Sequence, residues 1–163
     1  MSDRFMQRLN DDWRRTRPDL NVEPMLRVLS LTRLGQRLQA QLDQFLESNG
    51  LNAAAWDLLL ALYRSAPPEG LTPGELAQAC AVHGPAISNR IARLEERALV
   101  QRSTQAQDRR SVRITLTLAG RTIVEALLPP YIQLEEHLVI PLTPLSVVAL
   151  DEATHRLLAA LDD

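Results

Sequence analysis

The sequence predicts a mainly α-helical fold with a small β-wing, a hairpin of two strands. Apolar residues recur every three or four positions through most of the chain, as in amphipathic helices. Residues 112–116 instead alternate apolar and polar side chains, as half-buried strands do, and residues 99–102 supply a second short strand before them. With 163 residues, 45% of them hydrophobic, the chain is long enough for one folded domain with additional helices.

Two helices are expected in the N-terminal part. Phe5, Leu9 and Trp13 share one face of a helix over residues 2–15. Residues 16–24 contain two prolines and predict a loop. A long helix then covers residues 25–48, closed by Gly50, the residue type that best tolerates the conformation just past a helix end.

The middle of the chain predicts a helix-turn-helix. Asn52 is placed to cap a helix that runs to about residue 64. Residues 72–75 (TPGE) form a capping box with proline at the first helical position, and they open a helix of about eight residues. A four-residue turn leads to a second helix over residues 85–97. Its apolar stripe would be buried and its other face is small, polar or cationic, which is typical of a helix-turn-helix.

The wing and the C-terminal helices follow. Strands are predicted at residues 99–102 and 112–116, joined by a polar tip. Thr117 can cap a helix over residues 118–128, and Pro129 and Pro130 are expected to kink or break it before residues 131–139 continue it. A last helix begins at Pro144 and carries an apolar stripe of Val147, Leu150, Leu157 and Leu161.

Charge is concentrated in the middle of the chain. The formal net charge is −2, yet residues 84–118 contain seven Arg against three acidic residues. This distribution is typical of a nucleic-acid-binding module carried on an acidic body, although an Arg-rich solvated surface would give the same count. All 18 basic residues are Arg, so every cation has a planar, bidentate head group.

Other classes of protein are not favoured. Cys80 is the only cysteine, which excludes an intrachain disulfide and a Cys-rich zinc site, and the three histidines have no metal-ligand spacing. Neither a metal nor a cofactor is therefore expected. No nucleophile–base pair or phosphate-binding loop is present, so an enzyme is not expected. No apolar run reaches the roughly 18 residues of a membrane span and no secretory signal is found, which predicts a cytoplasmic protein.

Residues 71–120 resemble the winged helix-turn-helix of the MarR family of bacterial transcriptional regulators. The resemblance is carried by RLEE at 93–96, LVQR at 99–102, DRR at 108–110 and LTLAG at 116–120. It implies a homodimer that binds a pseudo-palindromic DNA operator, as a repressor. The implied organisation is an extra N-terminal helix and loop (1–24), a dimerisation and core helix (25–50), the winged helix-turn-helix (51–118) and C-terminal dimerisation helices (119–163). Ala98 stands where the family usually has Gly, at a cost on the order of 1 kcal/mol if the position needs a positive φ.

The resemblance also assigns DNA-contacting residues. Ser88, Asn89 and Arg93 would face base edges and phosphates in the major groove, because Asn pairs with adenine and Arg with guanine. Arg109 and Arg110 would enter or flank the minor groove from the wing. Asp108 would brace the wing through an ion pair, or act as a turn residue that bonds its own backbone. Asn89 and Arg93 could alternatively belong to an ordinary solvated helix face.

Within the family, the chain is similar to the urate-responsive branch. The similarity rests on the N-terminal helix with its Trp, on residues 17–20 (RPDL) and on residues 88–90 (SNR). It implies a ligand site of four residues: Trp13, Asp57, Arg90 and Arg102. Urate is a planar anion, which two guanidinium groups can hold while an indole packs on the ring. Purely structural roles remain open for all four residues, since Trp13 could staple its helix and the arginines could neutralise Asp57 or bind phosphate.

Three alternatives to this function remain. The regulator could respond to a different phenolic ligand, or to oxidation of Cys80, although a small buried hydrophobe is the commoner role for such a cysteine. The chain could also be an interaction module that does not bind DNA.

Overall fold

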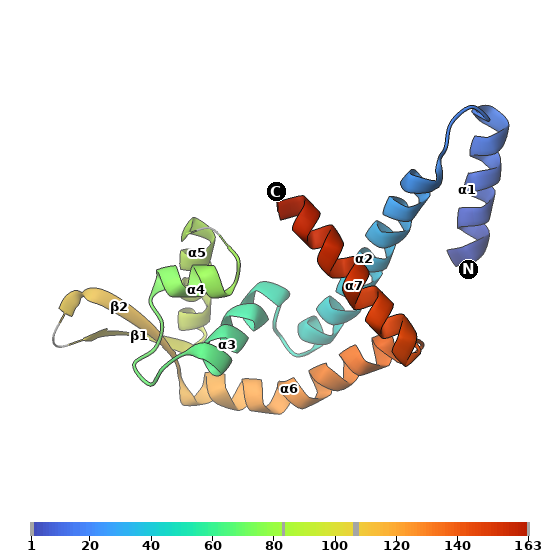
Figure 1. Cartoon of the computed structure of the whole chain (residues 1–163). Helices are drawn as coiled ribbons and strands as arrows, with labels where there is room; N and C mark the ends of the chain where they lie inside the picture. Colours follow the sequence, from blue (N-terminus) through green and yellow to red (C-terminus); the bar gives the residue numbers. More distant parts are fainter. Residues whose placement is uncertain (1, 83, 106–107, 163) are drawn as a thin grey trace. The chain divides into compact units, whose positions relative to one another are not determined.

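The protein is mostly helical with one two-stranded antiparallel sheet, as the sequence predicts (Figure 1). The computed structural model describes residues 2–82, 84–105 and 108–162, with side chains for 4–82, 86–103 and 112–161. The elements are α1 (Ser2–Thr16), α2 (Glu23–Ser48), α3 (Ala53–Ser65), α4 (Pro73–Ala79), α5 (Gly84–Glu96), β1 (Val100–Gln105), β2 (Asp108–Leu116), α6 (Leu118–Val139) and α7 (Pro144–Asp162).

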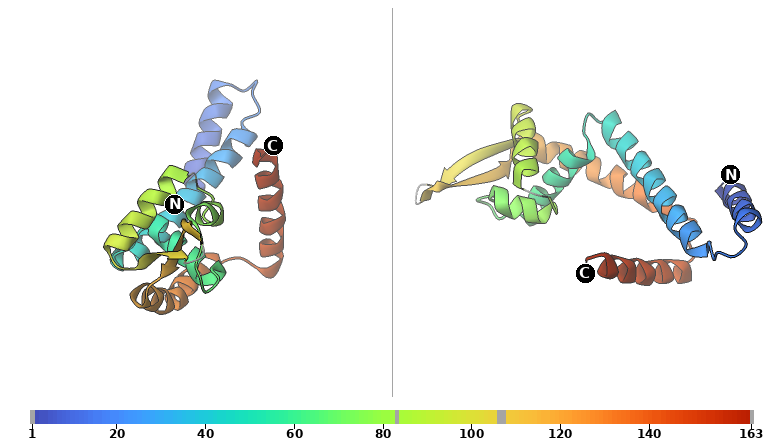
Figure 2. Two further views of the ribbon diagram at one scale, coloured as in Figure 1. Left: turned by 90° about the vertical axis from the view of Figure 1, so that its left-hand side faces the viewer. Right: turned by 90° about the horizontal axis from the view of Figure 1, so that it is seen from above.

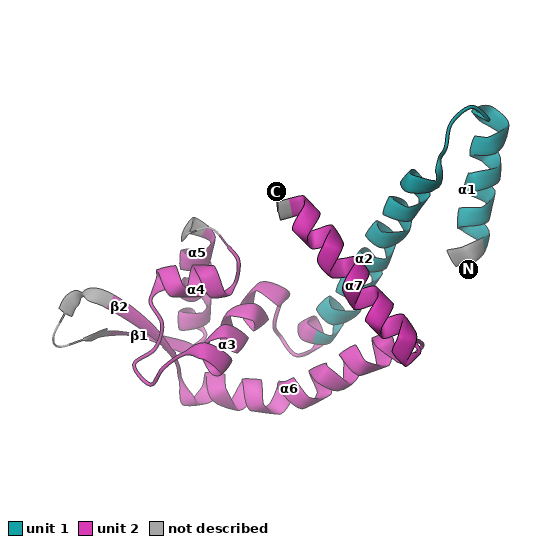
Figure 3. Ribbon diagram, in the orientation of Figure 1, with its two compact units in different colours: residues 1–45 teal, residues 46–163 magenta. Residues whose placement is uncertain are grey.

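The chain divides into two compact units, residues 1–45 and 46–163 (Figure 3). In the first unit, the Arg33 guanidinium of α2 lies 4.4 Å from the centre of the Phe5 ring of α1. Helix α2 begins two residues earlier than expected, because the Asn21 side chain accepts a bond from the Glu23 amide and Pro24 fits a first turn that needs no donor. In the loop, Arg17 holds Asp19 with two bonds of 2.9 and 2.7 Å.

The hydrophobic core belongs to the second unit and is centred on α3. Trp56, Leu58, Leu59 and Leu62 are at most 3% exposed, and apolar residues of α4, α5, the wing and α6 cover them. The Trp56 ring also contacts Tyr131 of α6 at 5.4 Å between ring centres. No residue is buried before Leu46 or after Val124 in the part of the chain whose side chains are described. The core therefore fixes the helix-turn-helix and the wing.

The three predicted helix caps of this unit are confirmed. The Asn52 side chain accepts a hydrogen bond from the Ala55 amide at 2.8 Å. Thr72 and Glu75 form the reciprocal capping box at the start of α4. Thr117 accepts a bond from the Gly120 amide at 3.0 Å at the start of α6. Each cap satisfies backbone donors that a first helical turn leaves unpaired.

Both strands of the wing are longer than the predicted segments 99–102 and 112–116. The register pairs Val100 with Leu116 and Thr104 with Val112, with an irregularity before Gln105 pairs with Asp108. The residues predicted as a polar tip thus lie largely within the strands, since ladder hydrogen bonds use the backbone and need no apolar side chains. Outside the two strands, Leu71 exchanges both backbone hydrogen bonds with Ile114 and forms an isolated antiparallel bridge beside β2. The hairpin extends away from α3, α4 and α5 in the right-hand view of Figure 2.

Of the two outcomes expected for the C-terminal helix at its prolines, a kink or a break, the break is wrong. Helix α6 runs without interruption from Leu118 to Val139, with Pro129 and Pro130 inside it, and its ribbon changes direction along its length (Figure 1). Because proline has no backbone N–H, Pro129 and Pro130 cannot donate the helical hydrogen bonds to the Glu125 and Ala126 carbonyls. The helical turns on either side keep their backbone hydrogen bonds. Pro129 is exposed. Water can therefore bond a carbonyl released on that side, so a bend suffices.

None of the helices in the described part of the chain is both long enough and apolar enough to span a membrane.

Candidate nucleic-acid interface and arginine pocket

The second helix of the helix-turn-helix presents a polar face to solvent. Ile87, Ile91 and Leu94 of α5 are each 1% exposed and pack into the core, which confirms the predicted stripe. Ser88, Asn89 and Arg93 lie on the exposed side of the same helix. A helix held by one face, with donors and a cation on the other, is suited to enter a major groove.

Helix α5 and the wing are tied together by side chains. The Arg102 Nε of β1 donates to a Glu95 carboxylate oxygen of α5 at 2.9 Å. Arg113 of β2 donates to the Gly70 carbonyl at 2.8 Å, and its Nη1 lies 3.8 Å from the Glu75 carboxylate of the capping box. These contacts fix the base of the wing against both helices of the helix-turn-helix.

The predicted wing residues lie on β2. Asp108, Arg109 and Arg110 occupy its first three positions, close to the tip of the hairpin. Their backbone is part of the strand, and their side chains lie outside the described residues. The predicted ion pair of Asp108 and the DNA contacts of the two arginines therefore stay predictions.

The four predicted ligand residues are distributed over both units. Trp13 belongs to residues 1–45, where it borders a shallow hollow with Leu9, Asp12 and Thr16 on α1. Asp57, Arg90 and Arg102 belong to the second unit.

Asp57 and Arg90 act on each other electrostatically. Desolvation raises the pKa of the Asp57 carboxyl above its ordinary value, while the charges of Arg90 and Arg64 oppose the rise. Arg102 instead has Glu95 as its partner. The structure thus couples Asp57 to Arg90 and gives Arg102 a structural contact.

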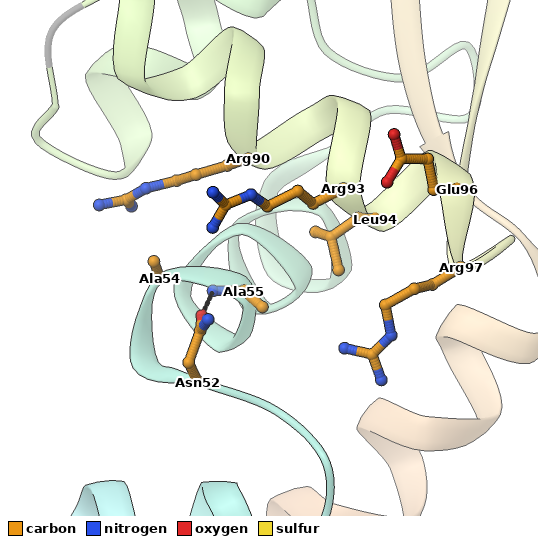
Figure 4. A pocket seen from close by; sticks show the side chains of 8 residues that line it. All are labelled: Asn52, Ala54, Ala55, Arg90, Arg93, Leu94, Glu96 and Arg97. Atoms are coloured by element: carbon orange, nitrogen blue, oxygen red, sulfur yellow. Dashed lines mark hydrogen bonds between the residues drawn. The ribbon is translucent and has the colours of Figure 1, made fainter.

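A pocket of about 280 Å³ lies between the first turn of α3 and α5 (Figure 4). Arg90 and Arg93 of α5, and Arg97 just past its end, line the pocket together with the start of α3, where Asn52 caps the helix. From the sequence, Arg90 is predicted to bind a ligand and Arg93 to contact DNA, whereas Arg97 is not singled out. The spacing of the three residues, i, i+3 and i+7, indicates one helix face and could have revealed the cluster.

Cys80 caps the end of α4 and is half-buried. Burial, and then the negative charge of Asp57, raise the pKa of its thiol, against the opposing charges of Arg90 and Arg64. A raised pKa lowers the thiolate fraction at neutral pH, which disfavours oxidation chemistry at this sulfur.

No group of three or more His, Cys, Asp or Glu side chains is arranged to hold a metal ion among the residues described.

Comparisons with known proteins agree with this geometry. A sequence model of the MarR family matches residues 49–111. The HTH-type transcriptional regulator PecS of Dickeya dadantii (strain 3937) is 30% identical over 143 residues, which are 88% of this chain and 82% of PecS.

Solved structures of regulators share the fold. Sco3205, a MarR family regulator from Streptomyces coelicolor in complex with DNA, has 26% identity and a TM-score of 0.78, covering 88% of this chain and 91% of that one. Bordetella bronchiseptica BpsR, whose DNA binding is regulated by 6-hydroxynicotinic acid, has 30% identity and a TM-score of 0.66, covering 82% and 96%. The chain belongs to the MarR family of DNA-binding transcriptional regulators.

Proposed function

We propose that this regulator is a repressor that binds a pseudo-palindromic operator as a homodimer and is released by a small anionic aromatic ligand. The observation that carries the proposal is α5: its apolar stripe is buried, and Ser88, Asn89 and Arg93 are left on an exposed face. The seven arginines of residues 84–118 supply the positive charge that DNA phosphates require. Arg109 and Arg110 would extend the contact from the wing to the minor groove.

Exposed apolar residues on the long helices support the homodimer. Leu145 and Leu161 of α7 are 80% and 81% exposed, and Val28 of α2 is 63% exposed. Large apolar side chains exposed along a helix often mark an interface between proteins. Two copies that pair through these helices would cover it and would present two recognition helices with two-fold symmetry, to match a pseudo-palindrome.

An excess of positive charge supports an anionic ligand. The similar regulator BpsR responds to 6-hydroxynicotinic acid, a planar acid, and urate is a planar anion of comparable size. Arg90 is the member of the predicted four-residue set that lines a pocket with further arginines. Asp57 acts on Arg90 electrostatically from α3.

Fluorescence polarisation tests the regulator and its ligand together. Labelled DNA from upstream of the gene for this chain is bound by the protein and titrated at fixed salt with urate, and separately with 6-hydroxynicotinic acid. We expect polarisation to fall as either anion saturates the protein. A complex that neither anion dissociates would contradict the proposed ligand class but not the proposed DNA binding. A protein that binds this DNA no more tightly than random DNA would contradict the proposed operator.

A further inference from the structure

We propose that Arg113 is a positioning residue for DNA binding, which sets the angle of the wing against the start of α4. Its Nη1 donates to the Gly70 carbonyl at 2.8 Å and lies 3.8 Å from a Glu75 carboxylate oxygen. Arg113 therefore joins β2 to the loop before α4 and to the capping box that starts this helix. The inference deepens the proposed function and rests on it for the DNA contacts of the wing.

The Gly70 carbonyl is a rigid partner, because its loop lies directly against β2. Leu71 exchanges backbone hydrogen bonds of 3.0 and 2.8 Å with Ile114, the residue after Arg113. Gly70 has φ 90°, and a Cβ at this position would lie 2.3 Å from the Ile114 carbonyl oxygen. The loop can come this close only with glycine here, so backbone geometry fixes the acceptor of the Arg113 bond.

Glu75 is held in place by its role in the capping box. Its carboxylate accepts from the Thr72 amide at 2.7 Å and from the Thr72 hydroxyl at 2.9 Å. These bonds, and then the charge of Arg113, lower the pKa of the Glu75 carboxyl, so the carboxyl is an anion at neutral pH. The capping box thus also fixes a negative charge beside the wing.

The surroundings of Arg113 argue against a purely stabilising role. Its side chain is 21% exposed, and its Nε atom is buried without a hydrogen-bond partner among the described residues. A buried donor without an acceptor and a desolvated charge both cost free energy, and an apolar side chain of similar length would avoid both costs. Directional contacts that orient β2 explain an arginine at this position better than stability does.

A change of angle at the base of the wing would be amplified toward its tip. Arg113 and Arg109 are four residues apart on β2. At the usual rise of a strand this is about 13 Å, so a rotation of about 10° at the base shifts the backbone near the tip by about 2 Å. Hydrogen-bond lengths vary by only about 0.5 Å. The proposed DNA contacts of Arg109 and Arg110 would therefore be lost without any change in these residues.

A second arginine holds the opposite face of the hairpin. Arg113 pairs with Ser103, the residue after Arg102 on β1, so the two arginines belong to opposite faces. Arg102 contacts Glu95 of α5, whereas Arg113 contacts the start of α4. One tie on each face limits rotation of the wing in both directions.

The test compares three variants of the full chain by urea denaturation and by affinity for DNA from upstream of its own gene. Arg113→Met keeps the length of the side chain but loses its charge and donors, and Arg113→Lys keeps the charge without the planar fork. Arg156→Met, on an exposed arginine of α7, is the matched control. We expect Arg113→Met to unfold at the urea concentration of the parent and to bind this DNA at least about tenfold more weakly. Arg113→Lys should recover part of the affinity, and Arg156→Met should match the parent.

A double-mutant cycle distinguishes positioning from a direct contact with DNA. Arg113→Met is also made in a chain that carries Arg109→Ala and Arg110→Ala. If Arg113 acts through the wing, its loss there should weaken DNA binding less than about threefold, because the contacts it positions are already absent. The same loss of affinity in both backgrounds would make Arg113 an independent DNA contact and overturn the proposal.

Hydrogen exchange without DNA separates this proposal from the proposed function. The amides of residues 112–116 should exchange faster in Arg113→Met than in the parent, while those of α3 exchange alike. Unchanged exchange of residues 112–116 would overturn the proposal, and so would parent-like DNA affinity in Arg113→Met. An Arg113→Met chain that does not fold would also overturn it, since Arg113 would then hold the fold rather than the wing. A parent that binds this DNA no more tightly than random DNA would instead contradict the proposed operator, and the exchange would still decide the role of Arg113.

Discussion

Two alanines adopt the left-handed backbone conformation that usually belongs to glycine. Ala98 has φ 54° and Ala81 has φ 50°, each just past the end of a helix of the helix-turn-helix. At the end of α5, the Ala98 amide donates to the Glu95 carbonyl and the Leu99 amide to the Leu94 carbonyl, the paired bonds of a Schellman motif. The departure of Ala98 from the family's glycine is therefore a local backbone strain within an otherwise complete cap.

Replacing Ala98 with Gly should stabilise the fold. The left-handed conformation costs an L-residue about 1–2 kcal/mol, and glycine avoids this cost. Glycine also makes the unfolded chain more flexible, which offsets part of the benefit, so we expect the free energy of unfolding to rise by up to about 1 kcal/mol. Urea denaturation followed by circular dichroism measures it. Ala92→Gly on the same helix is the control and should destabilise by a similar amount. An Ala98→Gly protein less stable than the parent would contradict the strain.

Asp57 links stability to pH with a definite sign. Desolvation raises the pKa of the Asp57 carboxyl above its ordinary value of 3.8. Below pH 3.8 the carboxyl is neutral in both the folded and the unfolded chain, so burying it carries no charge penalty. The protein therefore loses stability as pH rises through the raised pKa. Asp57→Asn removes this loss, and its stability relative to the parent should increase between pH 3.5 and pH 7. Asp19, whose pKa is lowered by Arg17, is the opposite case. Asp19→Asn should lose stability relative to the parent over the same range, and equal trends for the two variants would contradict the assignment.

At the scale of elements, Gly120 sets how closely α6 approaches the wing. A Cβ at this position would lie 2.0 Å from the Leu99 carbonyl oxygen, while Thr117 bonds the Ala98 carbonyl next to it. We expect Gly120→Ala to destabilise by about 1–3 kcal/mol, because backbone must move. In Gly35→Ala, within α2, the Cβ meets nothing within 4 Å, so that variant should be neutral or stabilised. Chemical denaturation compares the two variants, and similar effects would contradict the close approach.

Elements that depend on local chemistry could be predicted from the sequence. The caps at Asn52, Thr72 and Thr117 and the buried stripe of α5 follow from residue types at fixed spacings, and the structure has them. The strand lengths could not be predicted, because the hydrogen bonds between strands use the backbone and leave no pattern in the side chains. The continuity of α6 through its prolines could not be predicted either, because solvation of the released carbonyls is not visible in the sequence. The arginine pocket depends on α3 lying beside α5, a tertiary contact that the spacing on α5 alone does not specify.

At the scale of the whole molecule, we expect charged residues introduced on the apolar stripe of α7 to dissociate the proposed homodimer. Leu157 and Leu161 belong to the predicted stripe and are 49% and 81% exposed. If two copies bury them, each leucine contributes about 1.5–3 kcal/mol and counts twice by symmetry. The double change Leu157→Glu with Leu161→Glu should therefore raise the dimer dissociation constant at least about a hundredfold. Analytical ultracentrifugation measures it, with His155→Glu, outside the stripe, as the control; a double variant as dimeric as the parent would place the interface elsewhere.

We propose that the basic middle of this chain, residues 84–118, binds an operator through α5 and the wing. The most direct measurement is the affinity for DNA from upstream of its own gene as a function of salt, for the parent and for Arg110→Ala. Phosphate contacts predict an affinity that falls steeply with salt, and loss of one such contact predicts weaker binding with a slope smaller by about 1. Arg156→Ala on α7 should match the parent. Salt-independent binding, or an Arg110→Ala protein that binds as tightly as the parent at every salt concentration, would contradict the interface that the fold and the charge pattern support.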